Sequence, residues 1–395
     1  MKRRGFIATA SAAVAAGAAA TRARAQVIPE QPIQPQQQFL QQLTIAVSVT
    51  LSGTLQKYGQ EVVKGAQAAV DEQNRFFAPV SHVWGMRALD DRNDPGMAAS
   101  NANVAAADST VIGMIGNLTA PMTLAALSRY ANEGFAVICP TVTADAVTKR
   151  GYYNIYRLPA KDSASGRLFA NSALDGKRGV STLAVAFDGD YGYDVANGFV
   201  TAARINRHPS DLLLFPLNKT DPAQAARTVL DRSPGYVFLA GKTPELGPIA
   251  EALRVAGYTG DFGAADGFYN SETIATYAKT LEGAYVASPM PPIERVPSAV
   301  QLITDFEREV TQITTQSAFG YAAAQLMISA AQRANASTRS TLLRSMQSGG
   351  TFTTLVGQFA FNISGDPLIP NIYLYTVGTD GFKYARPAIR TGFVL

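Results

Sequence analysis

The chain has 395 residues, with 34 Lys and Arg against 30 Asp and Glu, and five of the basic residues but no acidic one lie in the first 25 positions. The remaining chain therefore has 29 basic and 30 acidic residues, and its net charge of about −1 excludes the basic surface that nucleic-acid or anionic-membrane binding requires. About 370 residues exceed what one hydrophobic core usually holds, so two domains are expected.

The first 25 residues have the pattern of an export signal. Three basic residues at 2–4 precede a weakly apolar run at 6–20, and Ala23-Arg24-Ala25 forms a cleavage site. The run is too short and too poor in large apolar residues to cross a bilayer. The string Arg3-Arg4-Gly5-Phe6-Ile7 resembles a twin-arginine signal and favours that route over the general secretory one, although Ala8 stands where Lys is common.

Residues 26–42 are rich in Gln and Pro and predict an extended leader between signal and fold. The only Cys is Cys139, so no Cys follows the cleavage site to carry a lipid anchor, and no internal disulfide can form. Cys139 closes an apolar run and is interpreted as a buried small hydrophobe. We therefore expect the mature protein to be free in the periplasm.

From Leu43 onward, short β-branched runs alternate with Ala-rich amphipathic stretches, which is typical of βαβ units around a mostly parallel sheet. The first block has predicted strands at 43–49, 83–89, 111–115 and 135–139 and helices at 60–74, 96–108 and 124–132. An extended segment at 154–159 leads to the second block, with helices at 163–174, 193–205, 223–230 and 245–256 and strands at 182–187, 212–215, 236–240 and 283–287.

A third block begins beyond Pro289. It has predicted helices at 298–311, 318–334 and 340–346 and strand-like segments at 357–361 and 371–377. The block is too small for a separate domain and too large for a tail, so we expect it to complete the two earlier lobes.

Open parallel sheets bind ligands in the loops beyond the carboxyl ends of their strands. Here these loops are 50–59, 116–121, 140–143, 188–192, 241–243 and 265–270. They contain hydroxyls, Gly, aromatic rings and few charges, which suits binding. Only His82 and His208 are present, the second in a predicted surface turn beside Pro209, so a His-based triad or metal site is not expected. We expect no catalytic residues, no metal and no cofactor.

One motif partly resembles a nucleotide-binding site. Gly241-Lys242-Thr243 ends like a phosphate-binding P-loop, but the Gly that the motif requires five positions earlier is Tyr236. No G-x-G-x-x-G follows the first strand either. Nucleotide and dinucleotide binding are therefore not expected.

The loop residues, taken in chain order, resemble the branched-chain amino-acid-binding family, the type I periplasmic binding proteins that feed ABC importers. The ordered set spans nearly everything from Leu43 onward. Its members are Ile45-Ala46-Val47, Leu51-Ser52-Gly53, Tyr58-Gly59, Gly65-Ala66, Asp90-Asp91 with Asp94-Pro95, Ile115-Gly116-Asn117, Pro140-Thr141-Val142-Thr143, Arg150-Gly151-Tyr152, Asp190-Tyr191-Gly192 and Ala265-Asp266-Gly267.

The resemblance implies the fold class: α/β, with two Rossmann-like lobes whose sheets are mostly parallel, joined by a three-strand hinge in the Venus-flytrap manner. It places lobe one at 43–162 plus 290–357 and lobe two at 163–289 plus 358–395. It also implies that a monomer closes on a small amino acid and delivers it to an ABC permease in the inner membrane, without chemistry on the ligand.

The resemblance also assigns roles in the site. Thr143, with the Thr141 backbone beside it, matches the residue that takes the ligand carboxylate, Tyr58 and Tyr191 match the aromatic walls of the two lobes, and Asp266 matches the acid that pairs with the ligand ammonium. The other loop residues expected at the ligand are Leu118, Thr119, Ala120 and Lys242. The alternatives are structural: Thr143 caps a helix turn, Asp266-Gly267 forms an ordinary turn, and each Tyr packs on a lobe edge.

Some positions depart from the family pattern. Ala120 replaces a small hydroxyl residue and Pro121 has no N–H, so one carboxylate donor is missing. Asn93 and Thr119 stand where the family has a disulfide, and the turn after the first helix is Phe76-Phe77-Ala78-Pro79 instead of Gly-rich. These departures leave an amide, a urea-like compound or an aromatic carboxylate as alternative ligands, and a ligand sensor as an alternative role.

Overall fold

The computed structural model describes residues 41–76, 82–217, 219–308 and 312–388. The predicted signal at 1–25 and the leader as far as residue 40 lie outside this part. The predicted end of the leader is wrong, because Gln41 and Gln42 already pair with His82 and Val83 as the first residues of a strand. No helix in the described ranges combines the length and apolarity needed to cross a membrane.

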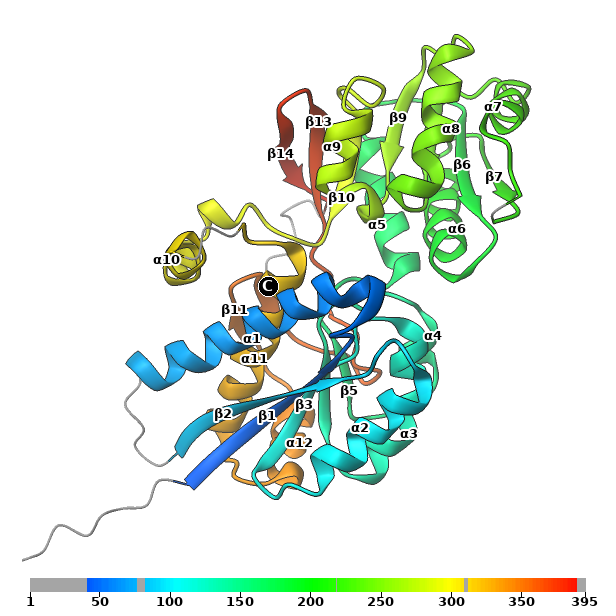
Figure 1. Ribbon diagram of the computed structural model, residues 1–395. Coiled ribbons are helices and arrows are strands. Elements are labelled where there is room, and N and C mark those ends of the chain that lie inside the picture. Colours follow the sequence, from blue (N-terminus) through cyan, green and yellow to red (C-terminus); the bar gives the residue numbers. More distant parts are fainter. Residues whose placement is uncertain (1–40, 77–81, 218, 309–311, 389–395) are drawn as a thin grey trace, which may run out of the picture. The chain divides into compact units, whose positions relative to one another are not determined.

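The first sheet has five strands, all parallel, in the order β2-β1-β3-β4-β5 (Figure 1). Each was predicted at or near its observed place as a strand or an extended segment. The strands are β1 (Gln41–Val49), β2 (His82–Asp90), β3 (Val111–Gly116), β4 (Ala136–Cys139) and β5 (Ile155–Arg157).

Alternate residues of the first sheet enter two different cores. Ile45 and Val47 of β1 pack with one set of helices, whereas Ala46 between them packs with another. The first set is α1 (Gln56–Phe76), α10 (Val300–Arg308), α11 (Thr315–Ala334) and α12 (Arg339–Gln347), and the second is α2 (Pro95–Ala106) and α3 (Ala120–Asn132). Cys139 lies in the second core, where burial raises the pKa of its thiol to about 12.

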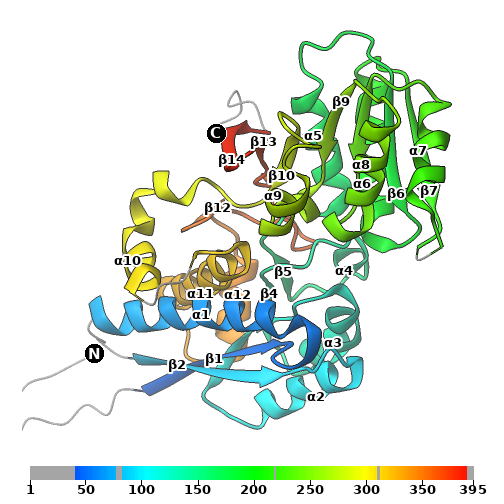
Figure 2. The ribbon, with the colours of Figure 1, turned by 45° about the horizontal axis from the view of Figure 1, so that its top comes forward.

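The second sheet has seven strands in the order β14-β13-β10-β9-β8-β6-β7 (Figure 2). Five are parallel, and β13 and β14 extend the sheet beyond β10 in antiparallel pairing, with β14 at the edge. The strands are β6 (Thr182–Phe187), β7 (Ser210–Phe215), β8 (Tyr236–Leu239), β9 (Asp261–Ala264), β10 (Tyr285–Ser288), β13 (Tyr373–Gly378) and β14 (Gly381–Pro387). The mixed but mostly parallel α/β class is thus confirmed.

Helices cover both faces of the second sheet as well. Ala184 and Ala186 of β6 face one core, and Leu183 and Val185 face the other. The first core includes α5 (Asp162–Ala173) and α6 (Asp190–Ile205), and the second includes α7 (Pro222–Leu230), α8 (Thr243–Val255) and α9 (Ser271–Tyr277).

The third block is divided between the two sheets, as expected. Its helices pack on the first sheet with a hairpin of β11 (Phe352–Thr354) and β12 (Gly357–Phe359), and β13 and β14 join the second. The sequence patterns missed β9, β11, β14 and α9. β9 is four residues long and contains Gly263, where a Cβ would overlap the Tyr236 hydroxyl, so it lacks the β-branched run that predicts a strand.

Glycines allow the closest helix contact of each lobe. A Cβ on Gly65 of α1 would overlap the Ser317 carbonyl oxygen of α11, and a Cβ on Gly166 of α5 would overlap the Val195 carbonyl oxygen of α6. The two helix pairs therefore approach at a distance that only Gly permits.

We predict that Gly65→Ala lowers the free energy of unfolding by about 2 kcal/mol, because α1 must move away from α11 to admit the methyl group. Urea denaturation measures this loss. Gln60→Ala, at an exposed position of the same helix, is the control and should stay within about 0.5 kcal/mol of the parent. Equal effects at the two positions would contradict the close contact.

Candidate ligand-binding site

A cavity of about 360 Å³ is lined by the loops that follow β3, β4, β6 and β8, with contributions from both sheets. These are carboxyl ends of parallel strands, where the sequence places the binding loops. Seven of the nine predicted ligand-binding residues line it: Leu118, Thr119, Ala120, Thr141, Thr143, Tyr191 and Lys242. Asp266 reaches it indirectly through Tyr191. Tyr58 is not among the lining residues and is 48% exposed in the first turns of α1.

The start of α3 forms one wall of the cavity. The helix was predicted from residue 124, but it begins at Ala120 because Thr119 has extended backbone angles and Pro121 occupies the first turn. The first N–H groups of a helix have no intrahelical partner, and they carry a partial positive charge. In α3 this holds for the first-turn residues other than Pro121, which has no N–H. The Thr119 hydroxyl is buried without a hydrogen-bond partner among the described residues. This wall can therefore donate to an anionic group despite Ala120 and Pro121.

The segment 141–144 forms the neighbouring wall and is fixed by hydrogen bonds. The Thr141 hydroxyl donates to the Leu118 carbonyl oxygen at 3.1 Å, and Arg157 Nη1 donates to the Thr143 and Ala144 carbonyl oxygens at 2.7 and 2.9 Å. The side chain of Arg157 is fully buried. Because both carbonyl groups point to Arg157, the Thr143 side chain is left to line the cavity.

Asp366 neutralises this buried guanidinium. Its Oδ1 lies 2.7 Å from Arg157 Nε, and it accepts a hydrogen bond from the Thr148 hydroxyl at 2.9 Å. Lys161 Nζ lies 3.7 Å from its Oδ2. Asp366 is more than 200 residues from Arg157 in the chain, so the pair ties the Thr143 segment to the connection between β12 and β13.

The opposite wall contains Tyr191, whose side chain contacts the carboxyl group of Asp266. The Tyr191 hydroxyl donates to Asp266 Oδ1 at 2.5 Å and accepts from the Gly267 N–H at 2.9 Å. Asp266 begins the short 3-10 helix Asp266–Phe268. Burial raises the pKa of Asp266, and the hydrogen bond from Tyr191 partly opposes this. A carboxylate in this setting gains from a cationic partner brought into the cavity.

The sequence patterns missed several lining residues, of which Asp162 and Glu245 are charged. Both stand in the first turn of a helix in the structure, whereas the sequence placed Asp162 just before the predicted helix 163–174 and Glu245 at the start of the predicted helix 245–256. Lys242 and Glu245 pair with each other at 3.6 Å. The signal that would have identified Asp162 is its position directly after β5, which belongs to the same sheet as the binding loops.

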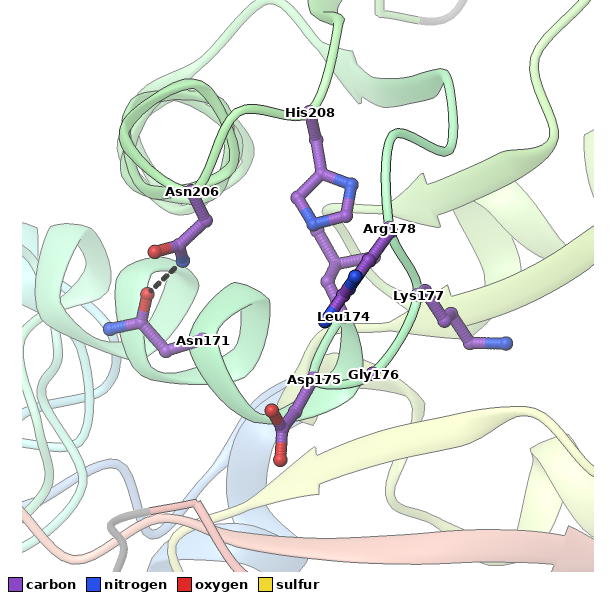
Figure 3. A pocket seen from close by; sticks show the side chains of 8 residues that line it. All are labelled: Asn171, Leu174, Asp175, Gly176, Lys177, Arg178, Asn206 and His208. Atoms are coloured by element: carbon purple, nitrogen blue, oxygen red, sulfur yellow. Dashed lines mark hydrogen bonds between the residues drawn. The ribbon is translucent and has the colours of Figure 1, made fainter.

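A second cavity, of about 390 Å³, lies at the carboxyl-terminal ends of α5 and α6 (Figure 3). Asn206 donates to Asn171 at one side of it, as the dashed line marks, and His208 and Arg178 line it elsewhere. The predicted surface turn at His208 is wrong, because the residue is only 6% exposed. Helix carboxyl ends carry partial negative charge and lie at the other edge of a parallel sheet, so the first cavity is the stronger candidate.

Comparison with known proteins gives one family and one fold. A family model described as a periplasmic binding protein matches residues 42–382. The Leu/Ile/Val-binding protein homolog 1 of Brucella melitensis is 24% identical over 345 residues, covering 86% of this chain and 92% of that protein.

Two solved structures share the fold. The leucine binding protein LivK of Thermotoga maritima has a TM-score of 0.74 and 21% identity, covering 87% of this chain and 98% of that one. The branched-chain amino acid transporter substrate binding protein LivJ of Streptococcus pneumoniae, in complex with isoleucine, has a TM-score of 0.72 and 22% identity, covering 88% and 100%.

Removing Asp366, the carboxylate that pairs with the buried Arg157, should destabilise the protein. We predict that Asp366→Ala lowers the free energy of unfolding by about 3–5 kcal/mol, because it leaves an uncompensated charge inside the protein. Chemical denaturation followed by circular dichroism measures the change. Asp211→Ala removes a carboxylate from an exposed ion pair and should stay within about 0.5 kcal/mol of the parent. A similar small loss in both variants would show that the buried pair does not matter.

Proposed function

The chain belongs to the periplasmic binding protein family, and from this premise we propose that it is the substrate-binding component of an ABC importer, with an amino acid as its ligand. The relatives described above support this assignment, since their names describe binding of leucine, isoleucine or valine. We further propose that the protein performs no chemistry on the ligand and acts as a monomer that delivers it to a permease in the inner membrane.

One observation carries the choice of ligand class. The cavity has donors on one side, at Thr119 and the start of α3, and buried carboxyl groups on the other, at Asp162 and beside Tyr191 at Asp266. An α-amino acid presents a carboxylate and an ammonium group to match these two sides. An aromatic carboxylate or an amide has no cation for Asp266, so it would leave that carboxyl uncompensated.

The roles predicted for individual residues fit this ligand and are proposed here as binding contacts. Thr119, Thr143 and the start of α3 take the carboxylate, with Thr141, Leu118 and Ala120 shaping that wall. Asp266 takes the ammonium. Tyr191 orients Asp266, Lys242 lies at the rim with Glu245, and Tyr58 comes to the ligand as an aromatic wall of lobe one when the hinge closes.

We propose that the two lobes are the bodies that close on the ligand, with lobe one at 43–162 plus 290–357 and lobe two at 163–289 plus 358–395. Phe359 packs in the first core and Ile372 in the second, which supports a last crossing between the lobes slightly later than residue 357. Ligand binding would then favour a closed state that the permease distinguishes from the open one.

The ligand class is tested by thermal unfolding with amino acids, amides and aromatic acids. A ligand present at a hundred times its dissociation constant stabilises the protein by about 2.7 kcal/mol, which is a readily measured shift. We expect leucine, isoleucine or valine to raise the midpoint and their deaminated analogues to have little effect. Stabilisation by aromatic acids or amides alone would reject the amino-acid assignment and keep the role of a binding protein.

For the ammonium contact, we predict that Asp266→Asn weakens amino-acid binding about 10- to 100-fold, because a charge-assisted hydrogen bond is lost. Isothermal titration calorimetry measures the affinity. Asp261→Asn is the matched control, since this Asp opens β9, is exposed, and pairs only with Lys177 in the described contacts. Unchanged affinity in Asp266→Asn would remove this residue from the site.

We also propose that the protein reaches the periplasm through a twin-arginine signal cleaved after Ala25. Replacement of Arg3 and Arg4 by Lys should then leave the uncleaved precursor in the cytoplasm, because that route requires the arginine pair. Cell fractionation checks this, and amino-terminal sequencing of the exported parent should begin at Gln26. Normal export of the double variant would instead indicate the general secretory route.

A further inference from the structure

Asp162 combines burial with access to the cavity. It is the first residue of α5, only 1% of its surface is exposed, and it lines the cavity. Its backbone N–H donates to the Thr143 carbonyl oxygen at 3.0 Å. Asp162 is therefore anchored beside the residue proposed to contact the ligand, at the proposed boundary between lobe one and lobe two.

One oxygen of this carboxyl group lacks a hydrogen-bond partner within the described part of the chain. Asp162 Oδ2 is buried without a hydrogen-bond partner among the described residues. Asp145 nearby is different, because its Oδ1 accepts from the Ser163 N–H at 3.0 Å and its Oδ2 accepts from the Ser163 hydroxyl at 2.7 Å. A buried carboxyl oxygen without a partner is unfavourable, so the unpaired group at Asp162 indicates a partner that arrives from outside.

The surroundings of Asp162 disfavour its ionised form. Burial is the main cause that raises its pKa well above the usual range, and neighbouring carboxylates add to it, while a hydrogen bond with the Thr143 side chain opposes the shift. The groups that face it are Asp266 of the 3-10 helix, Asp145 before the helix α4 (Ala146–Lys149), Arg157 of β5 and Tyr191 of α6. Arg157 favours ionisation, but Asp366 already neutralises it.

We propose that Asp162 is a second carboxyl group for the ligand ammonium, and that it is protonated in the empty protein and releases its proton to solvent when the ammonium binds. The proposal rests on the proposed function. Its free Oδ2 accepts a hydrogen bond from the ammonium group, and the positive charge of the ligand allows Asp162 and Asp266 to be ionised together. No bond other than the O–H bond of the acid breaks, and the proton leaves to buffer.

An ammonium group fits this position better than a metal ion. Metal ions of biological sites usually require three or more protein ligands, and the described residues contain no group of three His, Cys, Asp or Glu side chains arranged to hold one. An ammonium group has three donors and one positive charge, and the carboxyl groups of Asp162 and Asp266 can accept its hydrogen bonds and balance its charge.

Two consequences separate this role from a structural one. Affinity rises with pH wherever binding releases a proton, by up to about tenfold per pH unit. The empty protein, in contrast, loses stability as pH rises through the raised pKa of Asp162, because the folded state holds the proton more strongly than the unfolded chain. Asp162→Asn should therefore stabilise the empty protein at pH 8 and weaken ligand binding.

The test is calorimetry with L-leucine on the whole mature protein between pH 5 and 8, in buffers that differ in ionisation enthalpy. The dependence of the observed heat on the buffer gives the number of protons released. We expect up to one proton for the parent and none for Asp162→Asn, with affinity about 10- to 100-fold weaker at pH 8. The control, Asp145→Asn, should keep the proton release, because both oxygens of Asp145 already have partners.

The outcomes separate the two proposals. Leucine binding by the parent without proton release across the whole pH range overturns the role of Asp162, whether or not the variant folds, and leaves the proposed function intact. Proton release that persists in Asp162→Asn also overturns it. If no amino acid binds the parent, the proposed function is wrong and the Asp162 proposal falls with it.

Discussion

The ligand site depends on one buried cation. Arg157 has no exposed side-chain surface, and a charge in that position must be neutralised if the fold is to tolerate it. Its partners are Asp366, Thr148 and the carbonyl oxygens of Thr143 and Ala144. Through their contacts with this one guanidinium, the segment that lines the cavity and the connection from β12 to β13 are both held in place.

The interior pairing at Arg157 contrasts with the groups that face the cavity. The Thr119 hydroxyl and Asp162 Oδ2 are buried without a hydrogen-bond partner among the described residues, and both residues line the cavity. Unpaired buried groups reduce stability, and proteins retain them where binding or catalysis repays the loss. The two atoms have opposite preferences, one able to donate and the other able to accept, which is the complement of a zwitterion.

The sequence predicted the sheets well and the helix starts less well. β6 was predicted with its observed bounds, because the run Thr182–Phe187 is continuously apolar and ends at a turn. The start of α3 was missed, since Thr119 and Pro121 were assigned to a loop. Asp162 was missed because it stands one residue before the predicted helix 163–174 and belongs to none of the predicted binding loops. The burial that makes Asp162 chemically unusual comes from residues far apart in the chain, and no local pattern encodes it.

The central claim is that the cavity holds an α-amino acid with its carboxylate at the start of α3 and its ammonium at the carboxyl groups of Asp162 and Asp266. A crystal structure of the mature protein with L-leucine tests it most directly. The account predicts the carboxylate at the Thr119 and Thr143 hydroxyls and the first N–H groups of α3, and the ammonium between Asp162 and Asp266. Leucine bound in the reverse orientation, or in the cavity beside His208, would contradict it.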